Sequence, residues 1–324
     1  MTWAIRFHET GGPEVLRWEE VEPGRPGPGE VLVRHGAVGV NFIDTYHRTG
    51  LYPVELPSSL GMEAAGVVDA VGDGVVAVAP GDRVAYGGGP PGAYGQVRVM
   101  PADKLVRIPQ GIDDRTAAAI MVKGMTAEYL VRRTYLVQPG ETVLVHAAAG
   151  GVGLLLCQWA KHLGATVIGT VGSDEKAALA SANGCDHAIV YTREDFVSRV
   201  RELTGGRGVP VVYDSVGRAT WDGSLSCLQP RGLMVSYGNA SGAVPPFQPL
   251  VLSQRGSLYL TRPTLMAYVA TREELLESAS ALFEVILSGA VRVTIGQSWP
   301  LAEAAEAHRA LEARHTVGST VLLP

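Results

Sequence analysis

The feature of this sequence that most constrains its fold is an alternation of strand-like and helix-like segments in its second half. TVLVHA, ATVIGTV, HAIVY, VPVVYDSVG and LMVSYG are rich in β-branched residues, and segments with helical periodicity separate them. Strands that alternate with helices imply βαβ units, whose strands run parallel in one sheet. We therefore expect an α/β domain with a parallel sheet over residues 123–262.

The first 120 or so residues follow another pattern. Short β-branched runs such as Glu30–Val40, Ala64–Gly72 and Asp82–Tyr86 alternate with Gly and Pro, which predicts a compact β-barrel-like unit. After the α/β block the chain has a strand (SLYLTRP), two helices (TREELLESASALFEVILSG and LAEAAEAHRALEARH) and a last strand (GSTVLL). The sequence thus predicts that the α/β block, residues 123–262, is inserted into a second domain that consists of residues 1–122 and 263–324.

Charge and apolar patterning exclude several classes of partner. The net charge is −5 and no long run of Lys or Arg occurs, so nucleic acid and membrane surfaces are not expected partners. The apolar stretch Thr142–Ala160 is interrupted by three glycines and contains His146 and Gln158, which indicates a buried strand, turn and helix. The first ten residues lack an apolar signal core, and three widely spaced cysteines fit reduced core thiols. We expect a cytoplasmic protein.

A glycine loop joins the first strand of the block to its first helix. The sequence is His146-Ala-Ala-Ala-Gly-Gly-Val-Gly153. Ala147, Gly150 and Gly153 have the spacing of a dinucleotide-binding fingerprint, with alanine in place of its first glycine. Such glycines let backbone N–H groups approach a pyrophosphate at the helix N-terminus and let the helix pack closely on the strand. The loop predicts a dinucleotide site; a purely structural turn is the alternative.

The tip of the next strand indicates which dinucleotide. NAD sites usually place an acid there to hold the ribose 2′-hydroxyl, whereas this strand ends in Gly172-Ser173. Asp174 and Glu175 follow, in the first turn of a helix where they favour the helix dipole. Lys176 could reach a 2′-phosphate, although a solvated helix lysine is the alternative. The balance favours NADPH.

Several longer strings carry a family resemblance over essentially the whole chain. They include GGPEVL, VGVNFIDTYHRTGLYP, LGMEAAGVV and RGLMVSYGNASG. With them the chain resembles the medium-chain dehydrogenase/reductase superfamily, and specifically its zinc-free quinone oxidoreductase branch, which includes zeta-crystallin. The resemblance implies a Rossmann doubly wound sheet inserted into a GroES-like β-barrel catalytic domain.

The departures from the zinc-containing relatives imply metal-free chemistry. Their catalytic cysteine corresponds to Asn41 and the histidine of their GHE motif to Met62, while Glu63 remains. One carboxylate is no zinc site, because catalytic zinc has about three protein ligands. We expect no metal and leave His35 and His47 unassigned. Without a Lewis acid, the substrate must already be an electrophilic acceptor such as a quinone or a conjugated enone.

The resemblance also implies the site residues. Asn41, Tyr46 and Tyr52 would lie near the nicotinamide, Asn41 as an amide donor and the tyrosines as phenols that orient the acceptor; half-buried packing is the alternative for both tyrosines. Residues expected to bind the cofactor, at strand ends or where the C-terminal segment returns, are Asn41, Thr126, Ala149, Gly150, Gly151, Val152, Gly172, Ser173, Lys176, Tyr191, Ser215, Tyr237, Gly238 and Arg314. Asp214 is expected as a turn or sheet-edge residue.

The expected function is NADPH-dependent, metal-free reduction of small quinones. An NADPH-dependent enone or alkenal reductase and a non-catalytic NADPH-binding protein are the alternatives. We expect a homodimer through the strand SLYLTRP, because the last strand of the block is an unprotected edge that a second copy can pair with. An edge covered by the chain's own helix is the alternative there.

Overall fold

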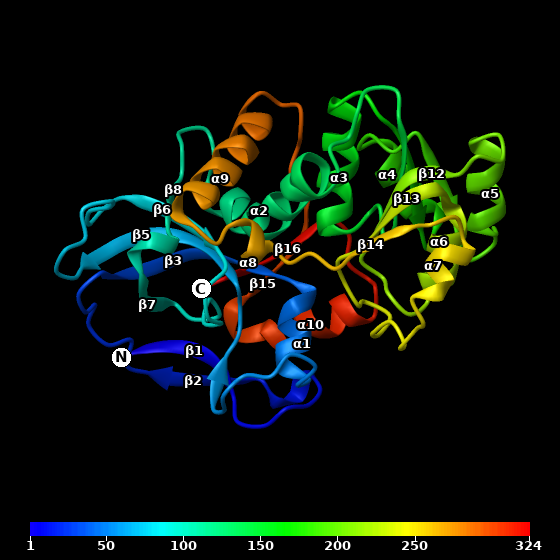
Figure 1. The fold of residues 1–324 in the computed structure, drawn as a ribbon. Coiled ribbons are helices and arrows are strands. Elements are labelled where there is room, and N and C mark those ends of the chain that lie inside the picture. The colour runs from blue at the N-terminus through cyan, green and yellow to red at the C-terminus, as the bar shows by residue number, and fades with distance from the viewer. The chain divides into compact units, whose positions relative to one another are not determined.

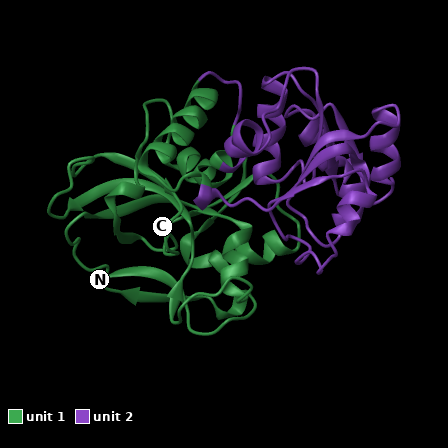
Figure 2. Cartoon of the chain, viewed as in Figure 1, with its two compact units in different colours: residues 1–125, 268–287, 293–324 green, residues 126–267, 288–292 purple.

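The computed structural model describes residues 1–324 and divides into two compact units (Figure 2). Unit 1 contains residues 1–125, 268–287 and 293–324, and unit 2 contains residues 126–267 and 288–292. The sequence analysis predicted two domains with other bounds, 1–122 plus 263–324 and 123–262. Those bounds stay a prediction. No helix combines the length and the apolar character needed to cross a membrane.

Unit 2 is built on a six-stranded, wholly parallel sheet (Figure 1). In spatial order its strands are β11 (His187–Val190), β10 (Thr166–Val171), β9 (Thr142–Val145), β12 (Val209–Asp214), β13 (Leu228–Ser236) and β14 (Tyr259–Thr261). The chain adds strands outward from β9 on one side and then restarts at β12 on the other. This is the doubly wound order that the family resemblance implied, and its switch point lies between β9 and β12.

Helices connect these strands at nearly the predicted places, except for the last of them, which the sequence did not predict. They are α3 (Gly151–His162), α4 (Asp174–Ser181), α5 (Phe196–Leu203), α6 (Trp221–Cys227) and α7 (Leu250–Gln254). Leu144, Ile168, Val212 and Trp221 are buried in the core that the sheet forms with them. The helix predicted over TWDGSLSCLQPRG is shorter than expected. Pro230 disfavours helical backbone in the residue before it, so α6 ends at Cys227 and the next residues join β13.

Unit 1 contains two sheets that are mostly antiparallel. The larger has the order β15 (Ile295–Pro300), β16 (Ser319–Leu323), β3 (Glu30–Val40), β5 (Glu63–Val71), β6 (Arg83–Gly87) and β8 (Val106–Arg107), with β7 (Val97–Pro101) also pairing with β3. The smaller consists of β2 (Arg17–Val21), β1 (Thr2–Phe7) and β4 (Ser58–Ser59). Because β16 pairs with β3, the C-terminal strand returns to the N-terminal sheet as predicted.

The helices of unit 1 include the two predicted near the C-terminus and others that the sequence pattern did not reveal. They are α1 (Phe42–Arg48), α2 (Asp114–Tyr129), α9 (Arg272–Leu287), α10 (Ala304–Glu312), the short α8 (Leu265–Tyr268, which spans the boundary to unit 2) and the 3₁₀ turns Pro13–Val15, Ala102–Lys104 and Leu301–Glu303. The unforeseen helix α2 begins where Asp113 Oδ1 accepts a hydrogen bond from the Thr116 N–H at 2.7 Å. It continues into unit 2 as a π-helical turn, Leu130–Thr134.

Candidate active site

The glycine loop has the close backbone packing that a dinucleotide site requires. It follows β9, and Gly150 is the N-cap of α3. Ala147 takes a positive φ of 53° at the position of the fingerprint's first glycine. A Cβ on Gly153 would lie 2.2 Å from the Ala147 carbonyl oxygen, and one on Gly150 would lie 3.2 Å from the same atom. Gly153 thus permits the helix to approach the strand, whereas at Gly150 only the Ala147 carbonyl oxygen lies close.

A buried polar network lies behind this loop. The Ser224 hydroxyl donates to Asp214 Oδ2 at 2.7 Å and contacts His146 Nε2 at 2.9 Å. His146 Nδ1 lies 2.8 Å from Thr170 Oγ1. Since Ser224 gives its one proton to Asp214, it accepts from Nε2–H, which leaves Nδ1 to accept from Thr170. Burial lowers the pKa of His146, with the charge of Asp214 opposing the shift. The network therefore holds a neutral imidazole.

Asp214 is not the sheet-edge residue that the sequence suggested. It ends β12, an interior strand, and is completely buried. Its Oδ1 accepts from the N–H groups of Val216 and Gly217 at 2.8 and 2.9 Å, which is the turn role expected of it. Ser224 is equally buried, so the Ser, His and Asp side chains do not form a nucleophilic site. They tie the ends of β9, β10 and β12 to α6.

The predicted phosphate-binding residues gather at the tips of β10 and β11. Ser173 caps α4 by accepting from the Lys176 N–H at 3.3 Å. A Cβ on Gly172 would lie 3.0 Å from the Tyr191 hydroxyl, so the two strand tips adjoin. The pKa of Asp174 is lowered chiefly by its hydrogen bond to Arg193, whose Nη2 lies 2.6 Å from Oδ1. Arg193 was not among the predicted residues, although it follows Tyr191 by only two positions.

The remaining predicted cofactor residues divide between the two units. Ser215 and Gly238 adjoin after β12 and β13, since a Cβ on Gly238 would lie 2.5 Å from the Ser215 carbonyl oxygen. The Tyr237 hydroxyl is buried, and burial raises its pKa. Thr126 corrects an expectation: it lies within α2, not at a strand end. Arg314 follows α10 in unit 1 and is exposed. The cofactor roles of all these residues stay predictions.

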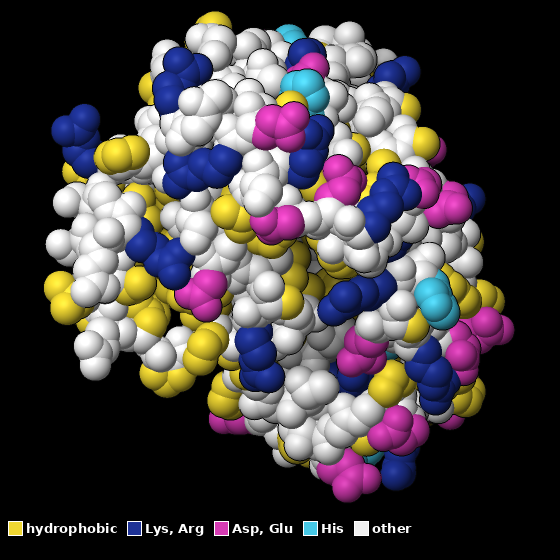
Figure 3. All heavy atoms as spheres, turned by 90° about the vertical axis from the view of Figure 1, so that its right-hand side faces the viewer, with side chains coloured by type: hydrophobic (Ala, Val, Ile, Leu, Met, Phe, Trp, Pro, Cys, Tyr) yellow, Lys and Arg dark blue, Asp and Glu magenta, His cyan; other side chains and the backbone are white.

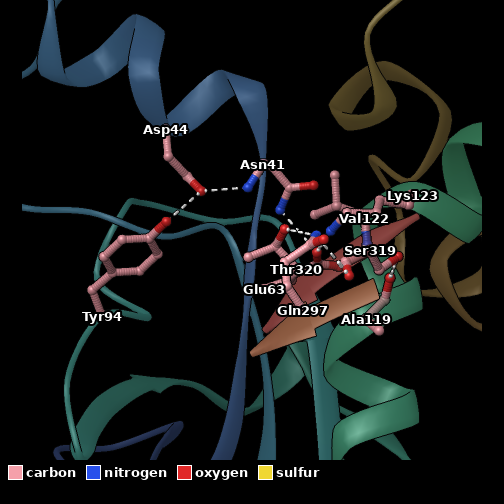
Figure 4. A network of polar contacts seen from close by, with 10 residues as sticks. All are labelled: Asn41, Asp44, Glu63, Tyr94, Ala119, Val122, Lys123, Gln297, Ser319 and Thr320. Atoms are coloured by element: carbon pink, nitrogen blue, oxygen red, sulfur yellow. Dashed lines mark hydrogen bonds and ion pairs between the residues drawn. The ribbon is translucent and has the colours of Figure 1, made fainter. Parts of the chain in front are cut away.

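In unit 1, hydrogen bonds fix Asn41 at the junction of β3 and α1 (Figure 4). Its backbone N–H donates to Asp44 Oδ2 at 2.8 Å, and its side-chain Nδ2 donates to Glu63 Oε1, also at 2.8 Å. The amide nitrogen that we expected to face a substrate oxygen is therefore already engaged by Glu63. The carbonyl branch of the same amide is directed away from Glu63.

Glu63, the first residue of β5, has both carboxylate oxygens occupied. Oε2 accepts from the Val122 N–H at 2.6 Å, and Oε1 forms an ion pair with the Lys123 ammonium. Both side chains are buried. A Cβ on Gly39 would lie 2.3 Å from Oε1, so the backbone of β3 must be bare there. A lysine cation thus compensates the one acid that remains from the metal-binding pattern of the zinc relatives.

A second buried chain of hydrogen bonds begins at Asp44. Tyr94 donates its hydroxyl proton to Asp44 Oδ2 at 3.0 Å and lies 3.0 Å from His308 Nε2. His308 Nδ1 accepts from Arg48 at 2.9 Å, and Arg48 in turn pairs with Glu312 at 2.7 Å. Burial raises the pKa of Asp44 to about 7, and burial together with Arg48 lowers that of His308 to about 3.

Tyr46 and Tyr52 lie against each other. Their ring centroids are 5.2 Å apart with an interplanar angle of 66°, and the Tyr52 N–H donates to the Tyr46 carbonyl at 3.0 Å. Tyr46 is 9% exposed and Tyr52 is half-buried. The structure brings the two phenols together on and beside α1. Their role toward a substrate stays a prediction.

The donor set of the chain does not match a metal centre. No group of three or more His, Cys, Asp or Glu side chains is arranged so that it could hold a metal ion. His35, unassigned from the sequence, is engaged on both nitrogens: Nδ1 lies 2.7 Å from the Gly95 carbonyl oxygen and Nε2 lies 2.9 Å from the Tyr86 hydroxyl. The three cysteines are buried and form no disulfide.

Comparisons with known proteins agree with this geometry. Residues 27–110 match the alcohol dehydrogenase GroES-like domain, and residues 151–283 match the zinc-binding dehydrogenase family. A quinone oxidoreductase of Pseudomonas aeruginosa is 56% identical over the full length of both chains. The crystal structure of Escherichia coli quinone oxidoreductase complexed with NADPH is 52% identical, with a TM-score of 0.98 over 99% of this chain and 100% of that one. A 2-haloacrylate reductase of Burkholderia is 49% identical over 100% of this chain and 99% of its own length.

Proposed function

The chain belongs to the quinone oxidoreductase branch of the medium-chain dehydrogenase/reductase superfamily, and from this premise we propose that it reduces small quinones with NADPH. It is an oxidoreductase, its cofactor is NADPH, and it combines a GroES-like domain with a Rossmann-type domain. The observation that carries the proposal is the glycine loop at the switch point of the parallel sheet. Ligands of open α/β sheets bind at the carboxyl ends of the strands near such a point.

The residues at this loop fit a dinucleotide. Gly150 and Gly151 leave room for backbone N–H groups to approach the pyrophosphate, and the N-terminus of α3 favours its negative charge. The tip of β10 carries no acid to repel a 2′-phosphate, and Ser173, Lys176 and Tyr191 gather there. NADPH, when bound, supplies the hydride. The protein's task is to orient the cofactor and the acceptor and to stabilise the oxygen that gains charge.

Unit 1 supplies the proposed contacts to the acceptor. Tyr46 and Tyr52 offer phenol donors on flat apolar bodies that suit a planar ring. Lys123 forms an ion pair with Glu63, and no group of three or more His, Cys, Asp or Glu side chains is arranged to hold a metal ion. A substrate without metal activation must be electrophilic by itself. Quinones meet this requirement, since they accept a hydride into a conjugated carbonyl system.

Steady-state oxidation of NADPH in the presence of several quinones and 2-enals tests the function. Faster turnover with quinones than with enals, unchanged after dialysis against a chelator, is the expected result. Turnover confined to enals would establish the enone reductase instead, an alternative that the 49% identical 2-haloacrylate reductase fits only loosely. NADPH binding without any turnover would establish the non-catalytic alternative.

The partners proposed are a small molecule and a second copy of the chain. Cations and acids are interspersed over the face that Figure 3 shows, and no broad basic patch suited to nucleic acid occurs there. Strand β14 lies at the edge of its sheet and pairs only with β13, and its Tyr259 is 63% exposed. An exposed strand edge supports a homodimer in which two β14 strands pair. A cytoplasmic location stays a prediction.

A further inference from the structure

Lys123 and Glu63 form a buried ion pair that the proposed function leaves unused. Lys123 is 5% exposed and Glu63 is fully buried. Removing two such charges from water is costly, and an apolar pair of similar size is often as stable or more so. A contribution to folding stability therefore does not by itself explain why the buried Lys123–Glu63 pair is present.

The pair has a specific effect on Asn41. Glu63 Oε1 accepts from Asn41 Nδ2 at 2.8 Å, while its other oxygen accepts from the Val122 N–H. A carboxylate can only accept hydrogen bonds, so it selects the nitrogen end of the neighbouring amide. The ammonium of Lys123 stabilises the negative charge that makes Glu63 an acceptor on both oxygens. The Asn41 amide is thereby held in one of its two orientations.

The consequence lies at the other branch of that amide. With Nδ2 turned to Glu63, the Asn41 carbonyl oxygen is directed away from the ion pair (Figure 4). A carbonyl oxygen has two lone pairs and accepts hydrogen bonds, whereas the reversed amide would present N–H groups in the same place. The ion pair thus decides whether this position accepts or donates a hydrogen bond.

We propose that Lys123 and Glu63 are positioning residues that hold the Asn41 carbonyl as an acceptor for an N–H or O–H group on the nicotinamide half of NADPH. This inference rests on the proposed function. The ion pair acts only through Asn41 and touches neither the cofactor nor the substrate. The Lys123 ammonium compensates the negative charge of the Glu63 carboxylate, as a bound metal cation would.

Glu63→Gln tests the proposal, because it removes the carboxylate that fixes the Asn41 amide and leaves a side chain of nearly the same size. The introduced glutamine has a single oxygen, with the Val122 N–H on one side and the Lys123 ammonium and the Asn41 amide on the other. It cannot accept from all three donors, so the Asn41 amide is no longer held in one orientation. We expect the affinity for NADPH, measured by isothermal titration calorimetry without substrate, to fall at least about fivefold, as for the loss of one hydrogen bond. Lys123→Arg, which keeps the charge, should retain more of the affinity for NADPH than Lys123→Met, which removes it.

The rescue variant is Asn41→Asp combined with Glu63→Gln. It conserves the total charge beside Lys123, and the introduced aspartate can accept from the introduced glutamine with one oxygen while its other oxygen faces the cofactor. We expect the double variant to regain most of the lost affinity for NADPH. A role limited to folding would give no such recovery. Failure of the double variant to recover, with a melting temperature equal to that of Glu63→Gln, would overturn the proposal.

Arg98→Met is the matched control, since it removes another buried cation of unit 1 that has no contact with Asn41 or Glu63. It should lower the melting temperature and leave the Kd for NADPH unchanged, whereas Lys123→Met should raise that Kd. If Glu63→Gln raises the KM for quinone but not the Kd for NADPH, the donor belongs to the substrate and the proposal is wrong. A wild type that binds NADPH but turns over no quinone would refute the proposed function instead, because these Kd values need no substrate.

Discussion

At the scale of single residues, we expect side chains at the tip of β10 to govern the choice between NADPH and NADH. Lys176 lies in the first turn of α4, beside the acid-free tip Gly172-Ser173. A hydrogen bond to a charged group contributes about 1.5–3 kcal/mol. We expect Lys176→Ala to weaken NADPH binding at least roughly tenfold and to leave NADH binding nearly unchanged. Calorimetric titration with both cofactors checks this; equal losses would show that the lysine does not recognise the 2′-phosphate.

Arg193 should act on the same choice through Asp174. Its guanidinium holds both carboxylate oxygens of Asp174, each at 2.6 Å, beside the proposed phosphate position. Arg193→Gln frees that negative charge, so NADPH should bind several-fold more weakly, and less so at high salt. Adding Asp174→Asn should restore most of the affinity. A double variant as weak as Arg193→Gln would mean that Arg193 contacts the phosphate itself.

Asp44 makes stability depend on pH. Burial raises its pKa from 3.8 to about 7 in the folded protein. Because the folded state binds the Asp44 proton more tightly than the unfolded state, this group adds to the free energy of unfolding. Its contribution is fully present below pH 3.8 and is lost as the pH rises through 7. Asp44→Asn can still accept from Asn41 and Tyr94. The variant should gain stability over the wild type from about pH 4 to about pH 8, measured by urea unfolding; an advantage that does not grow with pH contradicts the assignment.

At the scale of the element, we expect two glycines of the turn between β9 and α3 to have different roles, Gly153 in packing the helix on the strand and Gly150 in binding NADPH. A Cβ on Gly153 would meet backbone at 2.2 Å, whereas one on Gly150 would meet only one oxygen at 3.2 Å. Gly153→Ala should therefore lower the melting temperature by several degrees. Gly150→Ala should keep the wild-type melting temperature and weaken NADPH binding. Equal melting temperatures for the two variants would contradict this division.

The elements that sequence predicted well are those with a local signal. The strands and helices of unit 2 are marked by β-branched runs, by glycine turns and by the Ser173 cap. Helix α2 gives no such signal: nearly every residue from Ala117 to Val131 is buried, so the helix lacks the one-sided apolar stripe that identifies a surface helix. Only the packing of the whole chain determines that this segment is helical.

The polar networks were beyond sequence reasoning for a different reason. Ser224 lies 78 residues from His146, and Lys123 lies 60 residues from Glu63. No spacing rule relates such pairs, since the fold alone brings them together. The family resemblance indicated Asn41 as a site residue, and that role stays a prediction. Neither the resemblance nor the sequence could show which end of the Asn41 amide faces Glu63, because that depends on the fold.

At the scale of the whole molecule, the edge of the parallel sheet predicts the oligomeric state. If two β14 strands pair, light scattering at micromolar concentration should give twice the chain mass of 34.2 kDa. Tyr259→Lys places a charge on each edge and should shift the mass toward the monomer. A wild type of monomeric mass would count against pairing of this edge, as would a lysine variant that remains dimeric.

The Lys123–Glu63 pair also bears on how this protein comes to maturity in a cell. A cation that is part of the polypeptide arrives with translation, one per chain, in fixed stoichiometry. A divalent ion at the same carboxylate would have to be acquired, and copper or nickel could displace zinc there, since affinity for such ions follows their intrinsic order. A lysine at this position cannot be exchanged for a competing ion, so completing this part of the site requires no metal trafficking.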